Sequence, residues 1–261
     1  MGDNVALVTA RGGSQSIFNK NVLKIAGKPA LAYPILAAKE AARIAHVFVL
    51  TDCPRIKKVA GEFGATIINR PAELVGPNIH HGDAICYGVE QIVQAGIDPR
   101  IVTVLLGNTV MITPDLIDLS IEILESSPDW DSAMSVFQAQ DNHPYRAMLR
   151  RADGSLTSFL RDRGFSEPIH NTRQSYPPVY YYDQGVWTFR SEVASKREGP
   201  EPWWWMGKRV FPIVRHWVAG RDFHSGLDVD LARWWLDSGQ VDEICNLSEI
   251  GEVLRGSRSS P

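Results

Sequence analysis

The chain has 261 residues, 44% hydrophobic and 22% charged, with a net charge of −3 at pH 7. This composition is typical of a globular protein, and it lacks the basic excess that drives non-specific binding to nucleic acid or membranes. Three scattered cysteines favour a reducing cytoplasm over a disulfide framework. We find no signal-like N-terminus and no apolar run near the ~20 residues of a membrane span, so we expect neither a membrane nor a nucleic-acid partner.

Short apolar runs alternate with helical patterns through the first 106 residues. Such alternation predicts βαβ units and a mainly parallel sheet in an α/β fold. Glycines that follow the helical patterns, Gly64 and Gly96, support their C-terminal ends. The pattern predicts strands over residues 5–8, 47–50, 66–68 and 101–106, and helices over residues 31–43, 56–63 and 82–95.

The pattern changes after Asp129. Strands of mixed direction enclose a loop-rich insertion, which we expect to leave the sheet. We find no low-complexity linker, so we predict one domain over residues 1–261 with an insertion at about 140–180. In this second part of the chain we expect strands over 133–138, 146–150, 179–189 and 210–212. Residues 231–237 are expected to form the beginning of a terminal helix, and residues 256–261 a frayed tail.

The first strand runs into Ala10-Arg11-Gly12-Gly13-Ser14, a loop suited to holding a triphosphate. A Gly-Gly turn lets backbone N–H groups approach an anion. The planar guanidinium of Arg11 and the flexible ammonium group of Lys20 add positive charge that can bind phosphate oxygens. The loop matches neither the Walker pattern nor the dinucleotide fingerprint. An ordinary turn with a solvated Arg and Lys is the alternative.

Three of the predicted strands end at chemically useful residues. They end at Arg11, at Asp52 and at Gly107-Asn108. Ligands of open α/β sheets gather outside the carboxyl ends of the strands, so we expect these positions to border one crevice.

Seven sequence elements follow one another over residues 5–237. They are the opening loop with Lys20-Asn21 and Gly27-Lys28-Pro29, Thr51-Asp52, Asn69 to Leu74, His143-Pro144-Tyr145, Asn171 to Tyr180, Gly185-Val186-Trp187, and Leu227-Asp228-Val229-Asp230. In this order they resemble the cytidylyltransferases that make CMP-activated acidic sugars, typified by CMP-sialic acid synthetase. Each element is weak alone, but their common order makes chance agreement improbable.

The resemblance implies a Rossmann-like three-layer nucleotidyltransferase fold with a small β-rich dimerisation insertion. It also implies an enzyme that transfers CMP from CTP, with Mg²⁺, to an acidic acceptor and releases pyrophosphate. Positioning and charge neutralisation account for most of the catalysis in such reactions. The insertion is similar to a segment that exchanges between subunits, so we expect a homodimer in which Arg173 acts across the interface.

The resemblance also implies roles for individual residues. The catalytic residues are Arg11, Lys20 and Asp230, and the metal ligands are Asp228 and Asp230. The nucleotide-binding residues are Ala10, Arg11, Gly12, Gly13, Ser14, Lys20, Asn21, Asp52, Arg70, Pro71 and Gly82. The acceptor-binding residues are Asn108, Thr109, His143, Tyr145, Arg146, Arg173, Gln174 and Tyr180.

Asp228 and Asp230 carry the expected magnesium site. On an extended segment their side chains point to opposite faces, so we expect Asp230 to ligate the metal while Asp228 orients the site or a water. Replacement of Asp230 by Ala is then expected to abolish turnover and leave the fold intact. The alternative is a turn followed by a helix cap, a common role for Asp.

The chain departs from the family pattern on the acceptor side. Gly107-Asn108-Thr109 stands where the resemblance leads us to expect a glutamine that contacts the sugar, Gln15 replaces a lysine, and Asp183-Gln184-Gly185 replaces Asn-Gly. We therefore expect a divergent acceptor, either another keto-acid sugar or a small phosphonate or carboxylate. Arginine forks such as those of Arg146 and Arg173 suit these anions.

Two further features have alternative interpretations. His80-His81 with Asp83 suggests a helix start or an acceptor contact more than a metal site, because no second His pair completes a zinc set. The clusters Trp203-Trp204-Trp205 and Trp234-Trp235 fit a core edge or an interface, with base or sugar stacking as the alternative. The second functional hypothesis is a catalytically weakened homologue that binds nucleotide or acid as a regulator or scaffold.

Overall fold

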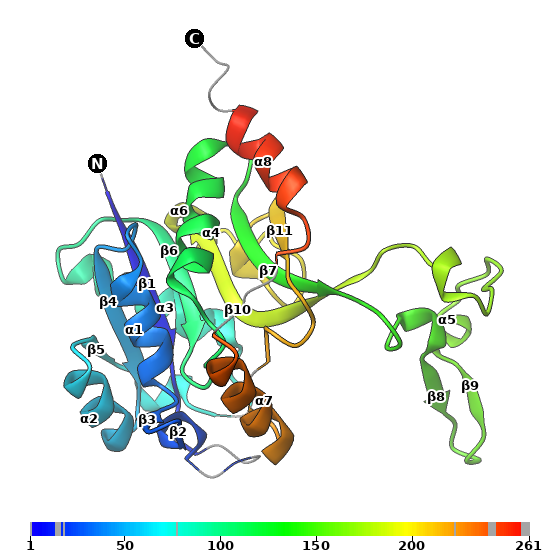
Figure 1. Ribbon diagram of the computed structural model, residues 1–261, viewed down its shortest axis with the longest axis horizontal. Coiled ribbons are helices and arrows are strands. Elements are labelled where there is room, and N and C mark those ends of the chain that lie inside the picture. Colours follow the sequence, from blue (N-terminus) through cyan, green and yellow to red (C-terminus); the bar gives the residue numbers. More distant parts are fainter. Residues whose placement is uncertain are drawn as a thin grey trace.

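The computed structural model describes residues 2–13, 17, 19–76, 78–221, 223–239 and 244–256. Within them, a seven-stranded sheet forms the centre of the molecule (Figure 1). All its strands are parallel except β10, which runs antiparallel to both of its neighbours. In spatial order the strands are β11 (Val210–Val214), β7 (Ser132–Gln138), β10 (Tyr180–Arg190), β6 (Pro99–Leu106), β1 (Asp3–Thr9), β4 (His46–Thr51) and β5 (Thr66–Asn69).

Alternate residues of β1 supply two separate cores. Ala6 and Val8 belong to the core on one face of the sheet, and Val5 and Leu7 belong to the core on the other. Successive side chains of a strand point to opposite faces, so a continuous apolar run is what a strand covered on both sides requires. This confirms the expected three-layer α/β fold.

Helices cover both faces of the sheet (Figure 1). The residues that face the first core come from α1 (Ala32–Glu40), α2 (Pro54–Glu62), α4 (Pro114–Ser126) and α8 (Leu247–Gly256). Those that face the second core come from α3 (His81–Gln94), α6 (Ser191–Ala194) and the 3-10 turn η5 (Trp204–Met206). None of the described helices is long and apolar enough to cross a membrane.

The structure adds helices that the sequence patterns did not predict. Thr113 caps α4 by accepting a hydrogen bond from the Leu116 amide at 3.3 Å, and Pro114 occupies the first turn. Helix α8 packs against α4 and buries Ile250 in the first core. The short hairpin of β2 (Lys24–Ile25) and β3 (Lys28–Pro29) was likewise not predicted, while residues 257–261 of the expected tail lie outside the described residues.

Helix α7 (Gly226–Asp237) begins five residues before the predicted start at Leu231. The prediction that Asp228 and Asp230 lie on an extended segment is therefore wrong, and the alternative, a capping role at a helix start, is confirmed for Asp228. Ser225 and Asp228 form a capping box, in which each side chain bonds the backbone of the other residue. Because a capping box satisfies backbone donors at a helix start, it explains why the helix begins here.

Between β7 and β10 the chain leaves the body as an arm, defined here as residues 139–179 (Figure 1). The arm holds the hairpin of β8 (Met148–Arg150) and β9 (Leu156–Ser158), followed by α5 (Phe159–Asp162). Strand β8 is shorter than the predicted 146–150, because Pro144–Arg146 forms the 3-10 turn η3. Met148 and Leu156 are 56% and 63% exposed, which leaves apolar surface on the arm.

Candidate functional site

The loop after β1 lies at the carboxyl ends of three neighbouring strands. Asp52, directly after β4, accepts a hydrogen bond from the Gly12 amide at 2.9 Å through its Oδ1. The buried Asn21 donates from Nδ2 to the Arg11 carbonyl oxygen at 3.0 Å. Gly107, after β6, packs so closely that an added Cβ would lie 2.7 Å from the Cβ of Ala10. The three strand ends therefore lie together, as expected, and the crevice between them stays a prediction.

Glycine is needed at two places in this loop. Gly13 has a φ of +69°, which favours glycine. A Cβ on Gly12 would lie 3.2 Å from the Cβ of Cys53, so the loop approaches the end of β4 closely. Ser14 and Gln15, both singled out from the sequence, lie outside the described residues.

Three cationic side chains surround the loop. Arg11 donates from Nη1 to the Gly76 carbonyl oxygen at 3.0 Å, and Lys20 donates from Nζ to that of Phe223 at 3.3 Å. The buried Arg70, between β5 and η2 (Ala72–Leu74), donates from Nε and Nη2 to the Leu74 carbonyl oxygen at 2.8 and 2.6 Å. Each of these three cations thus donates to a backbone carbonyl oxygen, and cations held in this way can bind a polyanion.

Arg70 and Asp52 interact electrostatically at the strand ends. Burial lowers the pKa of Arg70, and the Asp52 carboxylate opposes that shift while Arg11 adds to it. An arginine stays protonated even with such a shift, because its ordinary pKa is above 12. The structure therefore brings Arg11, Asp52 and Arg70 together as predicted, with Pro71 directly after Arg70.

His81, expected from the sequence at a helix start or an acceptor contact, lies beside the end of β1. Its Nε2 lies 2.9 Å from Thr9 Oγ1 at the end of β1, and its ring meets those of Trp187 and Trp205 edge-on. Burial, reinforced by the charge of Arg70, lowers the pKa of His81 to about 4. A neutral imidazole thus lies beneath the cationic loop, and its position at the start of a predicted helix was the available signal.

We expect His81 to make the fold sensitive to acid. Its folded pKa of about 4 lies below the ordinary value, so the unfolded chain binds more protons between those two values and stability falls as pH falls through this window. The loss from this group between pH 7 and pH 5 is about 2 kcal/mol. Urea unfolding at both pH values measures it. The His81→Gln variant should show a smaller difference, and an equal difference would contradict the assignment.

The neighbouring His80 and Gly82 have structural roles at the start of α3. His80 Nδ1 accepts hydrogen bonds from the Gly82 amide at 3.1 Å and from Trp204 Nε1 at 3.0 Å. A Cβ on Gly82 would lie 2.5 Å from ring atoms of both Trp204 and Trp205. This packing accounts for the glycine, and it supports the helix-start and core-edge interpretations of these histidine and tryptophan clusters. Contact of Gly82 with a nucleotide stays a prediction.

The predicted acceptor residues fall into two groups. Asn108 and Thr109 are buried directly after β6, beside the loop that follows β1. Thr109 Oγ1 has no hydrogen-bond partner among the described residues. The other members belong to the arm and its return into β10, away from that loop (Figure 1). They are His143, Tyr145, Arg146, Arg173, Gln174 and Tyr180.

His143 holds the base of the arm together. It is 3% exposed, its Nδ1 accepts from the Tyr145 amide at 3.1 Å, and its Nε2 donates to the Pro177 carbonyl oxygen at 3.0 Å. Its ring also packs against those of Tyr145 and Tyr176. Both ring nitrogens are engaged, so in this structure His143 orders the arm rather than facing an acceptor.

Arg146 and Arg173 converge on the exposed carboxylate of Asp141. Their Nη1 atoms lie 3.4 and 3.2 Å from its Oδ1, and both guanidinium side chains are about half exposed. Exposed pairs of this kind are weak, so both arginines remain able to meet another anion.

Asp228 and Asp230, the expected magnesium ligands, both lie on α7, and their binding of Mg²⁺ stays a prediction. Residues two apart on a helix do not face each other. Asp228 is buried, and hydrogen bonds from Arg221, His224 and Ser225 outweigh burial and lower its pKa to about 2. Asp230 is 70% exposed and pairs with Arg233 at 3.0 Å. The described residues contain no group of three acidic, His or Cys side chains that could hold a metal.

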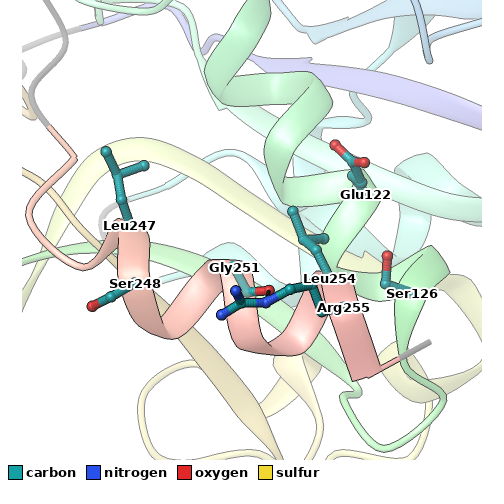
Figure 2. Close-up of a pocket in the computed structure, with 7 residues that line it drawn as sticks. All are labelled: Glu122, Ser126, Leu247, Ser248, Gly251, Leu254 and Arg255. Carbon is teal, nitrogen blue, oxygen red and sulfur yellow. Dashed lines mark hydrogen bonds between the residues drawn. The ribbon is translucent and has the colours of Figure 1, made fainter. Parts of the chain in front are cut away.

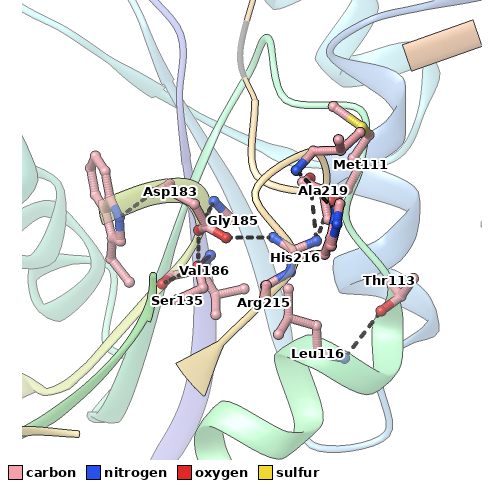
Figure 3. Close-up of polar contacts among 12 residues, drawn as sticks. Met111, Thr113, Leu116, Ser135, Asp183, Gly185, Val186, Arg215, His216 and Ala219 are labelled. Carbon is pink, nitrogen blue, oxygen red and sulfur yellow. Dashed lines mark hydrogen bonds and ion pairs between the residues drawn. The ribbon is translucent and has the colours of Figure 1, made fainter. Parts of the chain in front are cut away.

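A buried ion pair lies beside the strand ends (Figure 3). Arg215, after β11, donates from Nη1 to Asp183 Oδ2 at 3.0 Å and from Nη2 to the carbonyl oxygens of Met111 and Ala219 at 3.0 and 3.3 Å. Asp183 also accepts from Ser135 and from the Gly185 amide. The network thus joins β7, β10 and two loops, and only its residues Asp183 and Gly185 had been singled out from the sequence.

A separate groove of about 640 Å³ lies between α4 and α8 (Figure 2). Its walls include Glu122 and Ser126 of α4 and Leu254 and Arg255 of α8. It belongs to the helical layer rather than to the strand ends, so it is distinct from the candidate site.

The fold and the site together define an α/β protein with a basic glycine loop at the carboxyl ends of its strands, an arrangement typical of nucleotide binding. The family model described as "Cytidylyltransferase" matches residues 5–197. The chain belongs to the cytidylyltransferase family.

Individual relatives agree with this family. The chain is 40% identical over 70 residues to N-acylneuraminate cytidylyltransferase of Escherichia coli, which covers 27% of this chain and 17% of that protein. It is 28% identical over 199 residues to the Helicobacter pylori pseudaminic acid cytidylyltransferase and UDP-2,4-diacetamido-2,4,6-trideoxy-beta-L-altropyranose hydrolase. This match covers 75% of this chain and 36% of that protein. The matches thus span about a sixth and about a third of these relatives.

Among solved structures, CMP:2-keto-3-deoxy-manno-octonic acid synthetase complexed with CTP has the same fold. The two share a TM-score of 0.64 and 17% identity over 91% of this chain and all of that one. At this identity the likeness concerns the fold alone.

Proposed function

We propose that this protein transfers CMP from CTP to a small acidic acceptor and releases pyrophosphate. The observation that carries the proposal is the set of three cations, Arg11, Lys20 and Arg70, held by backbone carbonyls around a glycine loop at the strand ends. All three lie within the part of the chain that matches the cytidylyltransferase family.

In the proposed reaction, an acceptor oxygen attacks the α-phosphorus of CTP. The new O–P bond forms as the bond to the β-phosphate oxygen breaks, and pyrophosphate leaves with that electron pair. The acceptor hydroxyl loses its proton to solvent or to a phosphate oxygen. Arg11, Arg70 and Lys20 neutralise the triphosphate, and the Gly13 amide donates to its oxygens, since the Gly12 amide is bound to Asp52. Fixed donors of this kind stabilise developing charge without reorganising.

Magnesium belongs to the proposal as the counter-ion of CTP, because this cation is commonly bound by substrate phosphates and one or two carboxylates. Since Asp228 is committed to Arg221 and to the cap of α7, no step is assigned to a metal held by the aspartate pair. Asp230 is the exposed carboxylate of the pair.

We further propose a homodimer in which the arm contacts the second subunit. Exposed Met148, Leu156 and Phe159 provide apolar surface for that contact, and Arg146 and Arg173 provide cations for the partner's acceptor. Analytical ultracentrifugation tests the dimer. Leu156→Glu should produce a monomer, whereas a wild-type monomer at micromolar concentration would contradict the proposal.

The function is tested by pyrophosphate release in the presence of Mg²⁺. Each of the four nucleoside triphosphates is combined with N-acetylneuraminate, pseudaminic acid, 2-keto-3-deoxy-manno-octonic acid and a small phosphonate. We expect release with CTP and one class of acceptor. No release with any acceptor, together with calorimetric binding of CTP, would favour the second hypothesis, a homologue that binds nucleotide without turnover. No binding of CTP would contradict both.

A further inference from the structure

A second cleft, of about 250 Å³, lies where the arm, β10 and the loop before α7 meet. Phe137, at the end of β7, and Tyr181 and Tyr182 of β10 supply aromatic walls. The rings of Phe137 and Tyr181 are 5.6 Å apart, and Tyr182 packs on Trp203 at 4.5 Å. These contacts hold the aromatic side of the cleft in place.

The opposite wall of the cleft is polar and includes Arg221 and Gln184. Arg221 directs Nε and Nη2 at Asp228 Oδ1, at 2.9 and 2.8 Å. The Arg221 side chain is 40% exposed, whereas that of Asp228 is 1% exposed. A guanidinium has five N–H donors, so donors remain beyond those directed at the carboxylate. Asp228 therefore fixes a cation at the edge of the cleft.

Asp228 is itself held rigidly. Its Oδ2 accepts from the His224 amide at 3.0 Å, and from the amide and hydroxyl of Ser225 at 2.7 and 2.9 Å. With Arg221 on its other oxygen, the carboxylate has protein donors on both sides. These donors account for the burial of a carboxylate that the family resemblance implies as a metal ligand.

The loop that carries Arg221 also contacts the nucleotide side of the site. Phe223, two residues later, accepts the hydrogen bond from Lys20 Nζ at 3.3 Å. The Gln184 amide donates to the Gly220 carbonyl oxygen at 2.8 Å, which joins this loop to β10. A ligand in the cleft would therefore lie on a loop that also contacts a cation of the triphosphate site.

From this geometry we infer that the cleft binds the ring of a sugar acid, with the Arg221 guanidinium, positioned by Asp228, as the anchor for its carboxylate. Aromatic faces suit the apolar face of a sugar, and a planar fork suits a carboxylate. This inference rests on the proposed cytidylyl transfer and names the acceptor side of it. Asp228 is a positioning residue of the acceptor site, and Arg221 is the residue that contacts the acid.

Arg221→Gln tests the anchor, and the acids of the panel above are the probes. We expect the KM for the accepted acid to rise at least tenfold, while the KM for CTP stays within twofold. Arg221→Lys should recover part of the loss, because it keeps the charge without the fork. Arg255→Gln, on α8, is the matched control and should leave both constants unchanged. An unchanged KM for the acid in Arg221→Gln would overturn the inference.

Asp228→Asn separates a positioning role from a metal-ligand role. Calorimetry of CTP binding with and without Mg²⁺ needs no acceptor, so it decides this point independently. We expect the effect of Mg²⁺ on CTP binding to match the wild type, whereas its loss in a folded variant would overturn the inference. If the protein binds CTP and uses only the phosphonate, or none of the sugar acids, the sugar-acid assignment fails while nucleotide binding stands.

Discussion

Replacing Arg11 by Gln is expected to lower kcat/KM for CTP about 100-fold, because it removes a charge-assisted contact with the triphosphate. Arg11 donates a hydrogen bond to the Gly76 carbonyl oxygen, and its side chain is exposed. The loss of this side chain should therefore leave the fold unchanged. Steady-state pyrophosphate release at saturating acceptor measures the effect, with thermal unfolding as the check on folding.

Lys58→Gln is the control for the Arg11 variant. Lys58 is 79% exposed on α2 and pairs with Glu62 at 4.0 Å, so the control removes one positive charge away from the loop. It should change kcat/KM for CTP by less than twofold. Equal losses in the two variants would show that net charge matters rather than the position of Arg11, and no loss in Arg11→Gln would contradict the triphosphate site.

Replacing Arg215 by Met is expected to produce the largest loss of stability, about 3–5 kcal/mol of unfolding free energy. The guanidinium is fully buried, and its removal leaves the Asp183 carboxylate, 1% exposed, without its cation. Two carbonyl oxygens, of Met111 and Ala219, also lose their donor. Urea unfolding at pH 7 measures the change. The double variant Arg215→Met with Asp183→Asn should recover part of it, because the unpaired charge is gone.

Arg233→Gln provides the comparison for the buried pair. Arg233 and Asp230 form an exposed ion pair on α7, at 3.0 Å, and such pairs contribute about 0–1 kcal/mol. If Arg215→Met cost no more than Arg233→Gln, the buried pair would not hold the strand ends together. A large cost together with a raised KM for the acceptor would link the pair to the loops beside the cleft.

The central sheet was predictable because its signals are local. Apolar runs such as Val5 to Val8 can be buried only between two layers of helices, and each is followed by a recognisable helical pattern. The glycine loop was equally clear, because Gly12 lies close to Cys53 and Gly13 has a φ of +69°, which favours glycine. Helix α8 was missed, because its packing on α4 joins residues about 130 positions apart.

The sequence by itself determined the α/β order of elements, the cationic loop with Arg11 and Lys20, and the resemblance to cytidylyltransferases, because these depend on residues close together in the chain. Tertiary structure alone decided the roles of Asp228, His81 and Arg215. Each role depends on burial or on partners from other elements: Asp228 is buried while it holds Arg221, His81 loses its charge by burial beside Arg70, and Arg215 pairs with Asp183. The charge and direction of a side chain depend on its burial and on partners that are distant in the chain. Local sequence patterns predict neither the burial nor the partners.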